Sequence, residues 1–399
     1  MPARIRELRA LIQSSLSTSY TAASNAAWAP GTATKFAVTR WNQDSAKQAG
    51  IPSAVMQQRI GGRPHHLLGL DEGNLEMGIY AGRGSADTTA PAEATLLAAF
   101  LGGLASPSTK TDTVEAGSTA TSINCTAHGM SRGMAVLING EVRRLGAVTT
   151  DSYALQMALS SVPSEGDAIV NSHTVYHDES ATQDYLDLLA IGHNAEDQYQ
   201  YLGAMGGFGL EGIGLGELPE LVFDLRYAQK QVVPAAQRDQ LEPGEAAEGL
   251  SAPAGKEHGG LYFGNWGSTT AQLFSGGNWN INPGLVFEMI ENRNYANGIG
   301  GWKLVDVLPT FSFVTHVDSD YGLYADWAAK QHKQLLFQFG STAQNCFAVS
   351  LPRCCMDSEP APVAIGNLQG IAVEGHGAEP TQAAGVDNLQ TSAISFHWF

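Results

Sequence analysis

A pair of β-strands followed by a helix occurs twice in this sequence, and this repeated order constrains the fold more than any single motif. In the second occurrence we expect strands at residues 285–290 and 302–308, joined by an Asn- and Gly-rich segment. A third strand at 310–317 and a helix at 321–333 follow. Runs rich in β-branched and aromatic residues, bounded by Gly and Asn clusters, are typical of strands.

The first occurrence has the same order. Expected strands at residues 54–60 and 73–80 flank residues 61–72, and an apolar helix is expected at 92–101. A repeated order of elements is typical of duplicated units even when the copies share few identical residues. The sequence therefore predicts a mainly β protein with two related units in tandem.

Changes in composition divide the chain further. Residues 107–120 are small and polar, and residues 233–258 are rich in Pro, Gln, Glu and Ala, as in linkers. Between residues 121 and 173 we expect short strands at 135–138, 142–145, 153–157 and 168–170, the first two joined by Asn139-Gly140, a strong hairpin signal. The predicted organisation is a first unit at 1–106 and 174–232, a small inserted all-β domain at 107–173, a linker at 233–258, and a second unit at 259–399.

The charge balance excludes proteins that grip nucleic acid. The chain has 22 Lys and Arg against 39 Asp and Glu, a formal net charge of −17, whereas phosphate binding needs clustered cations. An acidic wall past which DNA moves without sticking remains compatible with this charge. Only 15% of the residues are charged, which indicates that much of the surface forms interfaces.

Neither the first residues nor the most apolar stretch of the sequence predicts a membrane protein. Residues 5–16 place apolar side chains at helical spacing and predict an amphipathic helix or arm, but Glu7 and Arg9 interrupt any signal-peptide core. The most apolar stretch, residues 94–105, is well short of the roughly 20 residues that cross a bilayer. The four cysteines show no spacing typical of a disulfide scaffold.

No catalytic or cofactor-binding motif is complete. Residues 207–212 match G-x-G-x-x-G, but more glycine follows where a dinucleotide-binding unit would begin a helix, so a flexible β-loop is expected. His316, Asp318 and Asp320 could bind a hard cation, but the favoured explanation is that Asp318 or Asp320 caps the helix that begins near residue 321. The chain is expected not to be an enzyme and to use no cofactor.

Two further clusters have a plainer structural explanation. His65-His66 and the cysteines Cys346, Cys354 and Cys355 lack partners at zinc-ligand spacing. A set of aromatic residues could stack on sugars, but such residues more often form cores or subunit contacts. The aromatic set comprises Trp279, Tyr295, Trp302, Trp327, Trp398 and Phe399.

The order of these segments resembles the tail tube (major tail) proteins of long-tailed, siphovirus-like bacteriophages. The resemblance rests on PAEATLLAAFLGG at 91–103, GMAVLINGEVRRLGAV at 133–148, LPELVFDLRY at 218–227 and SAISFHWF at 392–399. It implies two tandem tail-tube β-sandwich domains, each with a flanking helix, plus the small β-barrel-like insert. One sheet of each domain would join its neighbours around a channel.

The resemblance also implies partners and a location. The chain would assemble with itself into stacked rings, and because the family makes six-domain rings, two domains per chain imply a trimer with pseudo-sixfold symmetry. Terminator, distal tail and tape measure proteins would be further partners in the virion tail, which assembles in the host bacterial cytoplasm. DNA would pass through without specific binding, and no membrane would be involved.

Two sets of residues follow from this resemblance. The loops at 61–72 and 291–301 match the family's long hairpin loop and are expected to contact the next ring or subunit through Arg63, His65, His66, Arg293 and Tyr295. Acidic residues on the hairpin strands are expected to line the channel, since alternation directs one face of a strand toward it. These candidates are Glu76, Glu288 and Asp306.

Three other functions remain open at this point. A carbohydrate-binding adhesin would use the tryptophans and the acids near residue 318. An enzyme on a β-scaffold would need a perturbed acid pair in a pocket. A capsid or baseplate component would share the virion but not the tube.

Overall fold

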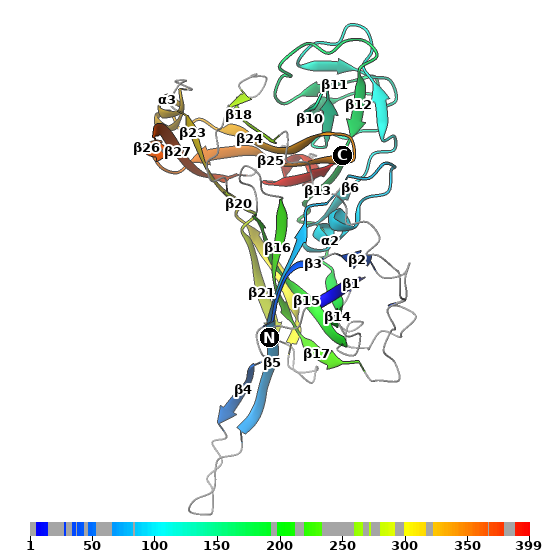
Figure 1. Ribbon diagram of the computed structural model, residues 1–399, viewed down its shortest axis with the longest axis vertical. Coiled ribbons are helices and arrows are strands. Elements are labelled where there is room, and N and C mark those ends of the chain that lie inside the picture. The colour runs from blue at the N-terminus through cyan, green and yellow to red at the C-terminus, as the bar shows by residue number, and fades with distance from the viewer. Residues whose placement is uncertain are drawn as a thin grey trace, which may run out of the picture.

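The fold is built almost entirely from antiparallel strands (Figure 1). The computed structural model describes residues 5–14, 28, 34–36, 38–43, 47–52, 66–82, 84–192, 198–211, 219–233, 259–265, 271–272, 280–291, 299–316, 322–365, 367–378 and 388–399. Within these residues, 20 strands join into one hydrogen-bonded network, six form a second sheet and two form a separate hairpin. The mainly β prediction is confirmed.

We divide the large network into three sections. The N-terminal sheet has the order β2 (Thr34–Phe36), β1 (Ile5–Gln13), β14 (Tyr185–Gly192), the first half of β15 (Gln198–Glu211), and β17 (Gln229–Val232). The C-terminal sheet has the order β6 (Gly102–Ala105), β13 (His173–His177), β28 (Ser395–Trp398), β25 (Asn345–Met356), β24 (Lys333–Thr342), β18 (Gly259–Gly264) and β19 (Ala271–Gln272).

The third section, which we call the spanning sheet, connects the two halves of the chain. Its order is β3 (Val38–Gln43), β5 (His66–Tyr80), β16 (Glu220–Tyr227), the second half of β15, β20 (Asn280–Asn282), β23 (Thr310–His316), β27 (Leu368–Gly377) and β26 (Ala361–Ile365). Strand β4 (Lys47–Pro52) pairs with the first part of β5, and this hairpin projects away from the body of the molecule (Figure 1).

Strand β15 belongs to two sections because it bends. Gly203 has a φ of 64°, a left-handed conformation that favours glycine, and its N–H donates to Oδ1 of the buried Asp187 at 2.9 Å. The pairing register with β14 shifts at the same place, between Leu186 and Leu188. The part of β15 up to Ala204 therefore pairs with β14, and the part from Met205 onward pairs with β16.

Helix α2 (Ala92–Leu101) fills the space between the N-terminal and C-terminal sheets. It contacts β6, β13, β14 and β15, and six of its residues are buried. It ends where Gly102 takes the left-handed conformation, with φ of 86°, and donates its N–H to the Ala98 carbonyl. The predicted helix at residues 92–101 is confirmed.

The segment between β6 and β13 forms the six-stranded sheet. Its order is β7 (Thr111–Thr113), β12 (Ala168–Asn171), β9 (Ala135–Ile138), β10 (Glu141–Val148), β11 (Ser152–Leu155) and β8 (Ser122–Asn124). These strands enclose a hydrophobic cluster that includes Ile123, Val136 and Tyr153. The remaining elements are the hairpin β21 (Leu285–Glu291) and β22 (Ile299–Val307), and the short helices α3 (Leu323–Ala328) and α4 (Asn388–Thr391).

Several sequence-based expectations are wrong in detail. Residues 5–13 form strand β1, not a helix, because pairing with β14 buries Leu8 and Ala10 at a spacing of two residues. Residues 203–211 form part of β15 instead of a loop, and residues 66–72 extend β5 into the expected loop.

The second expected helix is also shorter than predicted. It covers only Leu323–Ala328, since Lys333 already begins β24. Its N-cap is Gly322 rather than Asp318 or Asp320, which lie outside the described residues, as does the expected strand at 54–60.

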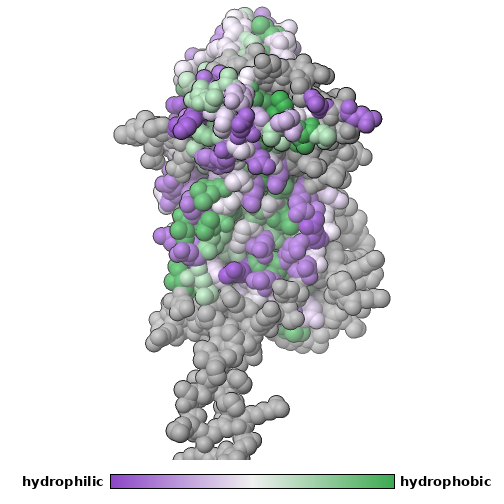
Figure 2. Space-filling model, turned by 90° about the vertical axis from the view of Figure 1, so that its left-hand side faces the viewer, coloured by the Kyte–Doolittle hydropathy of each residue, from purple (hydrophilic) through white to green (hydrophobic). Residues whose placement is uncertain are grey.

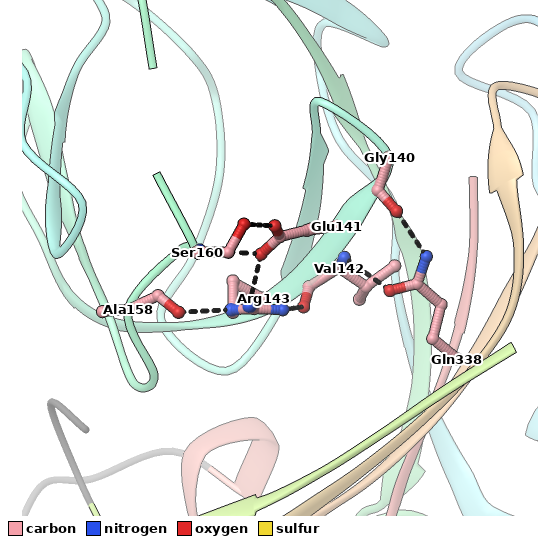
Figure 3. A network of polar contacts seen from close by, with 7 residues as sticks. All are labelled: Gly140, Glu141, Val142, Arg143, Ala158, Ser160 and Gln338. Atoms are coloured by element: carbon pink, nitrogen blue, oxygen red, sulfur yellow. Dashed lines mark hydrogen bonds and ion pairs between the residues drawn. The ribbon is translucent and has the colours of Figure 1, made fainter. Parts of the chain in front are cut away.

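The six-stranded sheet is attached to the C-terminal sheet by polar contacts (Figure 3). Gln338 of β24 accepts from the Val142 N–H at 2.8 Å and donates to the Gly140 carbonyl at 2.6 Å. The Arg143 guanidinium lies 4.2 Å from the centre of the Tyr262 ring and pairs with Glu141 at 2.5 Å. Around these contacts lies a shared apolar cluster that includes Leu336, Phe399, Leu137 and Met157.

We expect Gln338→Ala to lower the free energy of unfolding by roughly 2 to 3 kcal/mol, because it leaves the buried Val142 N–H and Gly140 carbonyl without a partner. Urea denaturation measures this difference. The exposed Gln331→Ala should change stability by less than about 0.5 kcal/mol. Equal losses in the two variants would show that the contact does not hold the sheets together.

A buried hydrogen-bonded chain joins three parts of the fold. His397 of β28 contacts the Ser350 hydroxyl through Nε2 at 2.8 Å and the Thr174 hydroxyl through Nδ1 at 2.9 Å. Thr174 in turn contacts Ser172, which accepts from the Ala135 N–H at 3.0 Å. Burial, followed by the charge of Arg144, holds the pKa of His397 well below its usual range, so the ring is neutral and fits one donor and one acceptor hydroxyl.

This histidine predicts how stability depends on pH. Its pKa is lower in the folded protein than in the unfolded chain, about 6.5, so below that pH the unfolded chain binds more protons and stability falls. We expect His397→Gln to be less stable than the wild type at pH 7.5 and to lose less stability between pH 6.5 and 4.5, by up to about 1.4 kcal/mol per pH unit. His173, whose pKa burial lowers to about 4, retains its own contribution. Denaturation curves across this range test the prediction, and an unchanged slope would contradict it.

Candidate functional site

The exposed face of the spanning sheet carries a cluster of acidic side chains. On β5 and β16, buried Leu75, Met77, Leu221 and Phe223 alternate with polar residues that point the other way. Pairing brings several of these polar residues side by side. We call the cluster formed by Arg40, Glu76, Glu211, Glu220 and Asp224 the acidic face.

The register explains why these residues meet. Glu76 on β5 lies directly opposite Asp224 on β16, and Glu220 on β16 lies opposite Glu211 on β15. Like charges placed directly opposite each other on neighbouring strands are destabilising. The arrangement therefore needs a compensating cation.

Arg40 on β3 supplies that cation. Its guanidinium lies 3.2 Å from the Glu76 carboxylate, 2.7 Å from Glu211 and 3.7 Å from Glu220. The hydrogen bond to Glu211 raises the pKa of Arg40 above its usual value, so the guanidinium stays charged. Gly78 leaves room for the Glu220 carboxylate, because a Cβ at residue 78 would lie 2.0 Å from Glu220 Oε1.

The face remains acidic despite Arg40. It holds four carboxylates against Arg40 and Arg226; Arg226 lies on the same side of β16 as Asp224, with its guanidinium 5.8 Å from the centre of the Trp302 ring. Gly207 and Gly209 on β15 add no side chain to this face, and together with Glu211 and Asp224 they line one wall of a cleft. Exposed carboxylates on such a surface disfavour binding of a polyanion.

The same face continues into the second half of the chain with small and polar residues. Leu210 pairs with Ile281, and both side chains point into the core. The outward-facing residues of β15 and β20 therefore lie on one side of the sheet. Ser312 on β23 then lies opposite Glu374 on β27, which is exposed. A cleft of about 560 Å³ lies at the joint, lined in part by Gly207, Asp224, Asn280 and Leu308.

The predicted channel residues do not form one group. Glu76 belongs to the acidic face, whereas Glu288 and Asp306 are exposed on the separate hairpin of β21 and β22. Glu288 lies opposite Lys303, and Asp306 accepts from the Val307 N–H at 2.8 Å.

The same hairpin exposes apolar side chains beside these charges. Val286, Ile290, Val305 and Leu308 have exposed fractions between 42% and 56%. On the side of the molecule that carries this hairpin, apolar and hydrophilic residues are interspersed (Figure 2).

The structure leaves the predicted contact loops largely undescribed. Arg63, His65, Arg293 and Tyr295 lie outside the described residues. His66 begins β5 within the projecting hairpin, but its side chain lies outside the described part. Their predicted role in ring contacts therefore stays a prediction.

Sequence reasoning missed four members of the acidic face. Arg40, Glu211, Glu220 and Asp224 come from three strands, and Arg40 is 171 residues from Glu211. The alternation in LVFDLRY at 221–227 could have placed Asp224 and Arg226 on one face. The register that brings Arg40 to Glu211 has no local signal.

The described residues do not assemble the other candidate sites. Within the described residues, no group of three His, Cys, Asp or Glu side chains could hold a metal ion. The Cys355 thiol contacts His332 Nδ1 at 2.6 Å, while Cys346 and Cys354 are buried. Trp302, Trp398 and Phe399 are buried, so these members of the aromatic set serve the core.

Comparison with known proteins finds no family model and no curated sequence that matches the chain. In the described part of the structure, no helix is long and apolar enough to cross a bilayer.

We expect Arg40→Gln to lower the free energy of unfolding by roughly 0.5 to 1 kcal/mol at low salt, because the carboxylates of the acidic face then repel each other without compensation. The loss should shrink as salt screens the charges. Arg132→Gln, an exposed arginine in the six-stranded sheet region, is the matched control and should show little change. Denaturation at two salt concentrations checks this, and a loss that does not depend on salt would contradict it.

Proposed function

We propose that this chain is a structural protein that polymerises as stacked rings into the tail tube of a long-tailed bacteriophage. The observation that carries the proposal is the spanning sheet, which passes from one half of the chain to the other through the pairing of β15 with β20. A sheet that already continues from unit to unit within one chain is suited to continue between chains. The sequence resemblance described above supplies the biological setting.

The acidic face supports a channel for DNA. A tube that delivers DNA must pass a polyanion without holding it, and carboxylates on the exposed side of a sheet meet that need. We propose that Glu76, Glu211, Glu220 and Asp224 line the channel. Glu288 and Asp306 on the second hairpin are further candidates.

Repetition within the chain supports the ring size. Each half has a hairpin that leads into the spanning sheet, then a helix, then the return strands. We therefore infer two tandem sandwich domains per chain with the six-stranded sheet as an insert, and a ring of three chains with pseudo-sixfold symmetry. The β4–β5 hairpin projects from the body (Figure 1), and we propose that it contacts the next ring.

The remaining parts of the proposal follow from this setting. The protein would act in the virion tail after assembly in the host cytoplasm, beside terminator, distal tail and tape measure proteins. It would carry out no catalysis. The burial of Trp302 and Trp398 argues against the alternative of a sugar-binding adhesin, since buried rings cannot stack on a glycan.

Electron microscopy with site-specific gold labels tests this proposal. After concentration, the purified chain should form tubes of stacked rings. In a Cys355→Ser background, Asp224→Cys labelled with a small maleimide-gold cluster should show gold along the tube axis. The matched variant Glu165→Cys, exposed on the six-stranded sheet, should show gold at the outer margin. Discrete globules without tubes, or Asp224 gold at the outer margin, would contradict the proposal.

A further inference from the structure

The joint between the halves of this chain indicates which strand edges join neighbouring chains. Within the chain, the outer edge of β15 pairs with β20 of the second half, antiparallel, through Leu210 and Ile281. Leu210 continues a buried row across the sheet with Leu221 and Ile79. The joint is short, because this is the one pair that bridges the two strands within the described residues.

The two halves of the spanning sheet repeat the same strand order. The first half has β3, β5, β16 and β15, and the second has β20, β23, β27 and β26. In each half the second strand of the set leads into a helix, α2 after β5 and α3 after β23. In each half the last two strands of the set are consecutive in the chain and antiparallel.

Residue rows agree with this correspondence. Pro362 on β26 lies opposite Ile371, which lies opposite the buried Thr315, so this row lies on the same side of the sheet as the buried row of Leu210, Leu221 and Ile79; Ile371 is half-buried, and Pro362, at the free edge, is exposed. Ala361 lies opposite Ala372, and both lie on the side of the sheet that carries Glu374. By position, β26 is the counterpart of β15, and β3 is the counterpart of β20.

Within the described residues, the outer edges of β3 and β26 pair with no strand. Strand β3 pairs only with β5, and β26 pairs only with β27. Unpaired edges expose backbone N–H and C=O groups that favour pairing with another chain. The small, exposed Ala361 and Ala364 allow close approach, whereas Pro362 lacks an N–H and limits the contact to a short one.

We propose that β26 of one chain pairs, antiparallel, with β3 of the next copy of the same chain. This inference rests on the proposed function and specifies its subunit contact. The two edges differ, so the contact is heterologous, and a heterologous contact yields a closed ring when its rotation closes. Val38 and Trp41 of β3, both half-buried against the core, would then continue the buried side of the sheet across the subunit boundary.

Cysteine crosslinking tests this pairing in the full chain. In the Cys355→Ser background, Asn42→Cys on β3 and Ala361→Cys on β26 place thiols on the same side of the sheet. A bismaleimide that spans about 8 Å covers direct and diagonal cross-strand neighbours, so the exact register need not be known. Denaturing gels of protein under assembly conditions then report which chains are joined.

The expected result depends on the combination of variants. The double variant should give covalent species of up to three chains, an equal mixture of the two single variants should give pairs, and each single variant alone should give neither. Glu165→Cys combined with Ala361→Cys is the matched control and should stay uncrosslinked.

Two outcomes separate this inference from the proposed function. Tubes that form normally without a crosslink between residues 42 and 361, or Asn42→Cys chains that crosslink to each other, would overturn the pairing while the tube function stands. Absence of any ring or tube from the wild-type chain would overturn both.

Discussion

This structure depends on one constraint: the backbone N–H and C=O groups at the edges of its sheets need hydrogen-bond partners. Strands with unpaired edges aggregate unless they are covered, charged or paired. Here the edge of β15 is covered by β20 from the other half of the chain. This pairing is possible because β15 bends at Gly203, with Asp187 holding the bend, and so leaves the N-terminal sheet to enter the spanning sheet.

The bend has a consequence for packing. Because the spanning sheet crosses between the halves, one hydrophobic cluster contains residues from both, including Leu75, Phe223, Phe311 and Phe396. Strand β28, near the end of the sequence, lies between β13 of the first half and β25 of the second. The halves therefore fold around each other, and the neutral His397 holds hydroxyls from both.

Charge and shape then act on opposite sides of the same sheet. Apolar residues on β5 and β16 face the core, and the alternate positions present Glu76, Glu220 and Asp224 to solvent. Carboxylates at neighbouring positions oppose folding, and Arg40 offsets part of this cost by contacting three of them.

The sequence predicted local features well and long-range ones poorly. The helix at 92–101 and the strand at 135–138 appear as predicted, because their apolar spacing and flanking glycines determine them locally. The helical spacing at residues 5–16 led to a wrong prediction, because pairing with β14 decides the conformation of β1. Of the acidic face, Glu76 was predicted from its place on a hairpin strand. Arg40 was not, because its contacts to Glu211 and Glu220 depend on the pairing of three distant strands.

The number of chains in each ring tests the central claim, that two sheet-joining units per chain close around one channel. Scanning transmission electron microscopy of unstained tubes gives mass per length, and the ring repeat from the same images converts it to mass per ring. Three chains of 42.2 kDa predict about 127 kDa per ring. A mass of six chains per ring, about 253 kDa, or a protein that stays a single 42.2 kDa chain at every concentration, would contradict the account.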